Sequence, residues 1–238
     1  MHVLIINGSP RTRQYSNTDR ILQKFTKGMC ENGSTFEQFE VSDRAQWDAM
    51  RLAFARNKNI LIALPLFVEC VPGLLMEFLE TLAPKQEGSA ISFLLQGGFP
   101  EAGQLRCGEA YLKILAKKLG CEYHGTLIRG NNFSIRFCSG KQREKLTEPY
   151  AEMGREFAAN GGFESEKCRQ FAGPEVFPVY MRWMIGLLQK TIGRHWADRI
   201  AREFGCRVPL DLRPYPAQSD PPQQNTVHET ASAQGIAD

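Results

Sequence analysis

Short apolar segments recur along the first two thirds of the chain, and they have the pattern of strands. Continuous apolar runs at Val3–Ile6, Ile60–Leu66 and Ala90–Leu95 are typical of strands buried on both faces, as in a parallel sheet. Phe36–Val41 alternates apolar and polar residues, which predicts a half-exposed strand nearer the edge of the sheet. Tyr123–Ile128 is the fifth expected strand.

Helices are expected between these strands. Ser16–Asp19 is a capping box, because the serine hydroxyl can accept from a free backbone N–H of the first turn, and the helix that it starts ends at Gly33. Further helices are expected at Trp47–Asn57, Pro72–Leu82, Ala110–Leu119 and Lys141–Ala159. Five alternations of strand and helix with short connections predict an α/β fold with a doubly wound parallel sheet.

The composition changes after Gly161. Phe177–Phe204 predicts one or two long helices, with apolar residues at steps of three or four and cations on another side. Such a stripe is buried against something: the chain's own sheet domain, an anionic membrane surface or a second subunit. We expect a homodimer to which this segment contributes contacts. The Pro-, Gln- and Ser-rich segment 213–238 is expected to be a disordered tail.

The expected domains are therefore a sheet domain at 1–162, a helical extension at 163–212 and the tail. Of the 238 residues, 42% are hydrophobic, so the chain can bury a substantial core. A balance of 29 Lys and Arg against 26 Asp and Glu is too even to indicate nucleic-acid binding. No apolar run reaches the roughly 20 residues of a membrane span, and no signal peptide precedes the first strand, so a cytoplasmic location is expected.

The seven cysteines give no sign of a metal site. Their number is odd and no C-x-x-C pair occurs, which argues against a zinc site, a clustered iron–sulfur site and a disulfide framework. We therefore expect reduced thiols and no metal.

The first strand leads into a loop that has the residues of an anion site. Asn7-Gly8-Ser9-Pro10-Arg11 and then Ser16-Asn17-Thr18 stand before a helix, whose free N–H groups and dipole attract negative charge. Hydroxyls and a guanidinium add bonds to phosphate oxygens. The loop lacks the lysine of a Walker A motif and the further glycines of G-x-G-x-x-G. A monophosphate such as that of flavin mononucleotide (FMN) fits it, whereas an ordinary capped loop is the alternative.

Two other strand ends have residues suited to a ligand. Pro65–Gly73 mixes aromatic, aliphatic and backbone groups, which suits a flat, largely apolar ring, although for Phe67 taken alone plain core packing is favoured. Gln96–Glu101 contains two glycines, which either let the backbone approach a ligand or form a turn.

These loops contain G-S-P-R followed by S-N-T, then P-L-F-V-E-C-V-P-G, then G-G-F-P-E. With them the chain resembles, over roughly residues 1–160, the flavodoxin-like NAD(P)H-dependent FMN reductases. The resemblance implies a five-stranded parallel sheet in the order 2-1-3-4-5, with helices on both faces. The C-terminal helical extension is expected from the apolar spacing at Phe177–Phe204. The resemblance also implies an FMN site in which Ser9, Arg11, Ser16, Asn17 and Thr18 bind the phosphate, Pro65, Leu66, Phe67 and Val68 line the ribityl chain and the ring edge, and Gly97, Gly98 and Phe99 close the other side.

The resemblance implies an enzyme that passes a hydride from NAD(P)H to FMN and then to a small acceptor such as a quinone or a flavin. This chemistry requires no side-chain acid or base, so no catalytic residue is expected. Arg11, Arg13 and Arg106 are candidates to meet a nucleotide phosphate. A flavodoxin-type electron carrier and a non-catalytic binding module are the alternatives. The net charge of +3 counts against the first, and the intact first loop against the second.

Overall fold

The computed structural model describes residues 1–86, 88–208 and 210–212. Its contacts divide the chain into two compact units, of which the first is Met1–Phe177 and the second begins at Pro178. Residues 163–177, which the sequence assigns to the extension, lie with the sheet unit in this division. The expected tail at 213–238 lies outside the described residues.

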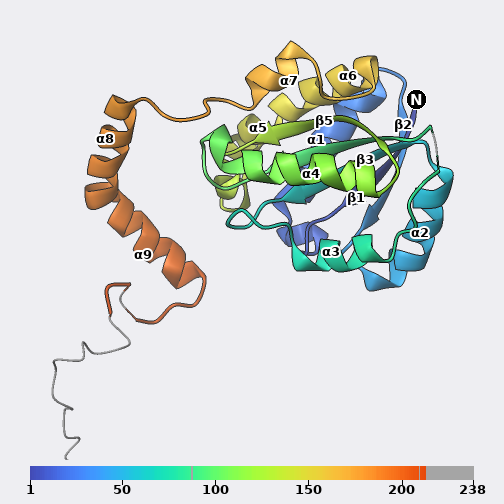
Figure 1. Cartoon of the computed structure of the whole chain (residues 1–238). Coiled ribbons are helices and arrows are strands. Elements are labelled where there is room, and N and C mark those ends of the chain that lie inside the picture. The colour runs from blue at the N-terminus through green and yellow to red at the C-terminus, as the bar shows by residue number, and fades with distance from the viewer. Residues whose placement is uncertain (87, 209, 213–238) are drawn as a thin grey trace, which may run out of the picture. The chain divides into compact units, whose positions relative to one another are not determined.

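The first unit is built on five parallel strands in the order β2-β1-β3-β4-β5 (Figure 1). They are β1 (His2–Asn7), β2 (Thr35–Glu40), β3 (Asn59–Pro65), β4 (Ala90–Gln96) and β5 (Glu122–Arg129). This confirms the predicted flavodoxin-like fold. The central strands are apolar at successive positions because both faces of the sheet are covered, whereas the edge strand β2 is partly exposed, as its alternation predicted.

Two layers of helices cover the sheet (Figure 1). On one face lie α1 (Asn17–Glu31), α5 (Gly140–Thr147) and α6 (Pro149–Asn160), which pack over Val3 and Ile5 of β1. On the other face α2 (Trp47–Arg56), α3 (Gly73–Glu80) and α4 (Arg106–Lys118) pack over Leu4 and Ile6. Successive residues of β1 therefore enter different cores, as the two-residue period of a strand requires. A short helix, α7 (Glu166–Phe171), lies against β5.

One helix predicted from the sequence is divided into two helices in the structure. A single helix is expected over Lys141–Ala159, but α5 ends at Thr147 and α6 begins at Pro149. Proline has no N–H to donate, so the hydrogen-bond ladder is interrupted at Pro149, although Glu148 keeps helical angles of φ −55° and ψ −38°. The prediction of one helix was wrong because it did not take Pro149 into account, and α7 was not predicted at all.

Helices α1 and α6 approach each other through two glycines. A Cβ placed on Gly154 would lie 2.0 Å from the carbonyl oxygen of Phe25, and one on Gly28 would lie 1.8 Å from the carbonyl oxygen of Ala151. The two backbones are thus in direct contact. This contact holds α1, and with it the loop that precedes α1, against the sheet.

The second unit contains α8 (Val179–Leu188), the π-helical segment η5 (Gln189–Gly193) and α9 (Arg194–Glu203). The long apolar segment was therefore correctly predicted to be helical. Neither α8 nor α9 has a buried residue among those described. Within the described part of the chain, no helix is both long enough and apolar enough to cross a membrane.

The contact between α1 and α6 predicts that Gly154→Ala destabilises the sheet unit. The added methyl group has no space beside Phe25, and overpacking of this kind costs about 1–3 kcal/mol. Thermal unfolding followed by circular dichroism should show a melting temperature several degrees lower. Gly73→Ala is the control, because no atom lies within 4 Å of a Cβ at that position. Equal melting temperatures for the two variants would contradict the close approach.

Candidate functional site

The loops that follow β1, β3, β4 and β5 meet at one edge of the sheet, because the strands are parallel. The side-chain hydroxyl of Thr18 accepts from Nε2 of Gln96 at 3.3 Å, which links the start of α1 to the end of β4. Nδ2 of Asn17 donates to the carbonyl oxygen of Asn132 at 2.8 Å, beyond β5. The guanidinium of Arg11 lies over the ring of Phe67, 5.7 Å from its centroid. The structure thus brings the three predicted loops together.

The first loop is fastened to the sheet by its own polar groups. The side chain of Asn7 donates to Glu40 at 2.6 Å and accepts from the backbone N–H of Ser9 at 3.1 Å. The Ser9 hydroxyl in turn accepts from the N–H of Arg11 at 3.3 Å. At Gly8 the chain runs so close to α3 that a Cβ would lie 2.6 Å from a methyl carbon of Leu75. The backbone at the start of the loop is therefore held in place before any ligand arrives.

The hydroxyl groups of this loop keep their donor hydrogens. Ser16 caps α1, accepting from the N–H of Asp19 at 3.1 Å, as the capping box predicted. Ser9, Ser16 and Thr18 all act as acceptors within the protein, so their O–H hydrogens remain for an acceptor such as phosphate. These residues are only 3%, 0% and 1% exposed, whereas the segment Arg11–Tyr15, which lies between Ser9 and Ser16 in the chain, is exposed.

The start of α1 is a region of positive charge. Burial and, next, the nearby Arg136 lower the pKa of Arg11. Burial and then Arg143 lower the pKa of Arg20, while Asp19 opposes the shift. Within the part of the chain that the structure describes, no ion pair involves Arg11, Arg20 or Arg143. Their field adds to the dipole of the helix and favours an anion.

The sequence reasoning missed Arg136 and Arg143. Arg136 ends the 3-10 turn η4 (Phe133–Arg136) after β5, and Arg143 lies in α5. No local motif marks either residue, because each reaches the start of α1 only through the tertiary fold. Arg20 and Arg143 also line a polar hollow of about 750 Å³ along α1, and the Nε atom of Arg143 is buried without a hydrogen-bond partner.

Two other arginines that the sequence offered as phosphate contacts are engaged elsewhere. Arg13 donates to Glu40 at 3.2 Å, and Arg106 donates to Glu109 at 2.6 Å. Arg106 also pairs with Glu175, and this pairing raises its pKa further above the ordinary arginine value. Arg13 and Arg106 are thus held by carboxylates of the protein. Of the three arginines considered as phosphate contacts, Arg11 is the one that these ion pairs leave available to a ligand.

Aromatic side chains stand exposed at the same edge of the sheet. Phe67 follows β3, Phe99 follows β4, and Phe133 follows β5, with exposed fractions of 40%, 63% and 44%. Phe133 was not predicted, but its Cβ lies 3.6 Å from where a Cβ on Gly98 would stand. Exposed aromatic faces at the carboxyl ends of parallel strands are suited to stacking with a flat ring.

Three predicted residues have a supporting role in this structure. Pro65, Leu66 and Gly97 are buried. The N–H of Leu66 donates to the carbonyl oxygen of Gln96 at 2.8 Å, and the carbonyl oxygen of Gly97 accepts from the N–H of Asn132 at 3.0 Å. These residues therefore join the strand ends to one another, while Phe67, Val68, Gly98 and Phe99 form the exposed rim.

The loop after β3 contains a strained turn. Phe67 and Cys70 exchange backbone hydrogen bonds of 2.9 and 3.0 Å across Val68 and Glu69, whose φ angles are 47° and 66°. Two central residues with positive φ are typical of a type I′ turn, which favours Asn-Gly, and a β-branched valine rarely adopts this conformation. The side chain of Val68 is 86% exposed, so no packing contact explains the residue.

No protein-family model and no curated protein matches this chain. Among solved structures, a putative quinone reductase from Klebsiella pneumoniae is 10% identical, with a TM-score of 0.51 over 68% of this chain and 87% of that one. An NADH:FMN oxidoreductase in its apo form is 15% identical, with a TM-score of 0.48 over 73% of this chain and 96% of the other. The NAD(P)H:quinone oxidoreductase from Methanothermobacter marburgensis is 16% identical, with a TM-score of 0.48 over 67% and 98% of the two chains.

At identities this low the comparisons bear on the fold alone. Of these three structures, the one from Klebsiella pneumoniae supports the fold assignment, because its TM-score exceeds 0.5. Together with the strand order, it shows that this chain has the flavodoxin-like α/β fold.

The turn after β3 predicts that Val68→Asn stabilises the sheet unit. Asparagine adopts positive φ more easily, and relief of the strain is expected to contribute about 1 kcal/mol. The melting temperature should rise by a few degrees. Val176→Asn is a matched control, since Val176 is also exposed, at 62%, but lacks a positive φ. A gain of the same size in both variants would show that the turn is not strained.

Proposed function

We propose that this protein is an FMN-dependent oxidoreductase that uses NAD(P)H as its hydride donor and a small molecule, such as a quinone or a flavin, as its acceptor. One observation carries the proposal: the positively charged start of α1 and the exposed aromatic rim lie at the same edge of the sheet. In a flavodoxin-like sheet, ligands bind at the carboxyl ends of the strands. The structural likeness to a putative quinone reductase supports the same class of reaction.

The phosphate of FMN is assigned to the first loop. Arg11 supplies a charge-assisted bond, and the backbone N–H groups at the start of α1 supply further donors. The hydroxyls of Ser9, Ser16 and Thr18 are assigned as further donors to the phosphate. Asn17 keeps the helix start in position through Asn132.

The ring of FMN is assigned to the rim. Phe67, Val68 and Phe99 contact it, Gly98 lets the backbone approach, and Pro65, Leu66 and Gly97 hold the strand ends beneath. When bound, FMN supplies hydride transfer between NAD(P)H and the acceptor. The side chains of this site position the reactants and exclude water, and none of them is assigned a proton transfer. The homodimer expected from the sequence stays a prediction.

The colour of the purified full-length protein after incubation with FMN tests the proposal. We expect a yellow protein whose flavin absorbance bleaches when NADPH or NADH is added without oxygen and returns when a quinone is added. A yellow protein that neither donor bleaches would be an electron carrier or would use another donor. A protein that cannot be loaded with FMN would refute the assignment.

Replacement of Arg11 tests the phosphate position. Arg11→Glu removes a charge-assisted bond and brings a negative charge to the phosphate, so FMN affinity should fall about 30- to 1,000-fold, or about 2–4 kcal/mol. Quenching of FMN fluorescence measures the affinity. Lys58→Glu makes the same change of charge immediately before β3, at the opposite edge of the sheet, and should bind FMN normally. Wild-type affinity in Arg11→Glu would place the phosphate elsewhere.

A further inference from the structure

The helices of the second unit expose large apolar side chains along their whole length. Trp183 is 73% exposed, Leu187 53%, Ile192 68% and Trp196 53%. In α8 the sole charged residue is Arg182, so apolar side chains surround most of that helix. An arrangement of this kind is not stable in water without a cover.

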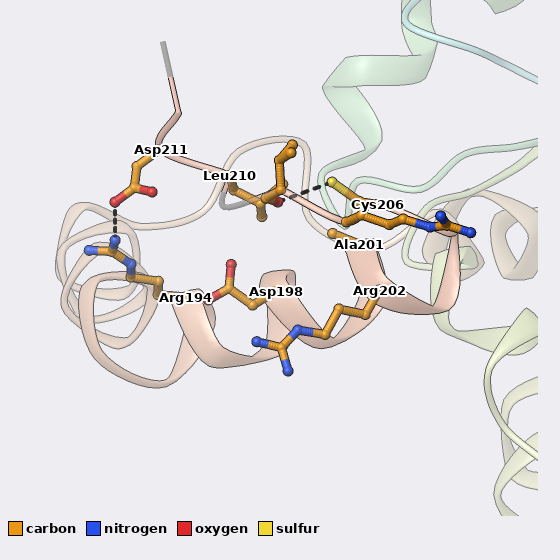
Figure 2. A pocket seen from close by; sticks show the side chains of 9 residues that line it. Arg194, Asp198, Ala201, Arg202, Cys206, Leu210 and Asp211 are labelled. Carbon is orange, nitrogen blue, oxygen red and sulfur yellow. Dashed lines mark hydrogen bonds and ion pairs between the residues drawn. The ribbon is translucent and has the colours of Figure 1, made fainter. Parts of the chain in front are cut away.

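The apolar and polar residues form two opposite stripes. The apolar stripe advances in steps of four residues and consists of Met184, Leu188, Ile192, Trp196 and Ile200. Two positions earlier, and so on the opposite side of a helix, runs the polar stripe of Arg182, Lys190, Arg194, Asp198 and Arg202, with Gly186 as its one apolar member. Figure 2 shows Arg194, Asp198 and Arg202 along one side of α9.

The π-helical segment η5 reduces the drift of these two stripes around the helix axis. Four-residue steps exceed the 3.6 residues of an α-helical turn, so a stripe with that step drifts slowly around an ideal helix. The wider turn of η5, in the middle of the stripe, offsets part of this drift. The amphipathic surface Val179–Phe204 is therefore continuous through both helices.

This surface carries a positive charge. Its flanks and the segment that follows contain twice as many cations as carboxylates: Arg182, Lys190, Arg194, Arg199, Arg202 and Arg207 against Asp198, Glu203 and Asp211. Two of the carboxylates are paired within the unit, Asp211 with Arg194 at 2.6 Å (Figure 2) and Glu203 with Arg199 at 3.4 Å. Positive charge therefore remains on the polar stripe, at Arg182, Lys190 and Arg202.

We propose that the surface Val179–Phe204 binds, without spanning it, a membrane that contains anionic phospholipids. Apolar side chains with Trp and Tyr on one side and Lys and Arg on the other are typical of helices that lie in the membrane interface. The width of the apolar arc favours lipid over the second copy of the chain that the sequence analysis expected on this segment. A partner helix covers one seam, whereas Tyr180, Trp183 and Leu187 would stay exposed beside it. The proposal depends on the second unit alone and not on the proposed enzymatic activity.

Tryptophan emission of the full chain with vesicles tests the proposal. Trp47 is buried, so Trp183 and Trp196 dominate any change. We expect a blue shift and co-flotation with vesicles of phosphatidylglycerol and phosphatidylcholine. Binding to pure phosphatidylcholine should be weaker, and added salt should reduce the difference.

Matched variants separate the two stripes. Leu188→Asp, in the apolar stripe, should weaken vesicle binding about tenfold or more, while Leu52→Asp, at another exposed helical leucine in α2, should not. Lys190→Glu should weaken binding to anionic vesicles about tenfold, while Lys117→Glu, on the exposed face of α4, should not. Far-ultraviolet circular dichroism of each variant verifies its fold.

Either of two results would overturn the proposal. The first is that the wild type shows no preference for anionic vesicles, because it binds anionic and neutral vesicles equally or binds neither. The second is a dimer, seen by light scattering, that Leu188→Asp dissociates while the wild type does not bind vesicles, because the surface would then be covered by a second copy of the chain.

Discussion

The parallel direction of all five strands is the constraint on which the rest of this structure depends. Parallel strands need a crossover between them, and each crossover here places a helix over one face of the sheet. Both faces are consequently buried, which explains the continuous apolar runs in β3 and β4. The same constraint brings the ends of β1, β3, β4 and β5 to a single edge, so that residues far apart in sequence, such as Asn17 and Asn132, are hydrogen-bonded.

The polar groups at that edge have two duties. Ser9, Ser16 and Thr18 satisfy donors of the protein itself, and Asn7 ties β1 to Glu40 at the end of β2. Buried polar groups need such partners, because an unpaired donor or acceptor away from water is costly. A hydroxyl is suited to both duties, since it accepts from the protein through a lone pair and keeps its hydrogen for a ligand.

The charges are divided in a similar way. Glu40 engages Arg13, and Glu175 and Glu109 engage Arg106, so these arginines stabilise the loops to which they belong. Arg11 and Arg20 have no such partner among the described ion pairs, and their lowered pKa values reflect burial together with neighbouring guanidinium groups. The protein therefore concentrates positive charge at the start of α1, where the helix dipole has the same sign and the carboxylate of Asp19 offsets part of it.

The sequence alone determined the fold class, the five strands, the cap at Ser16 and the loops of the candidate site, because each depends on local periodicity or on a side chain that bonds its own backbone. The single helix expected over Lys141–Ala159 did not take account of Pro149, where the structure begins a second helix. Only the tertiary structure could add Arg136, Arg143 and Phe133 to the site, since they reach it from beyond β5. Only the structure could show that Leu66 and Gly97 support the strand ends, because burial depends on neighbours that are remote in sequence.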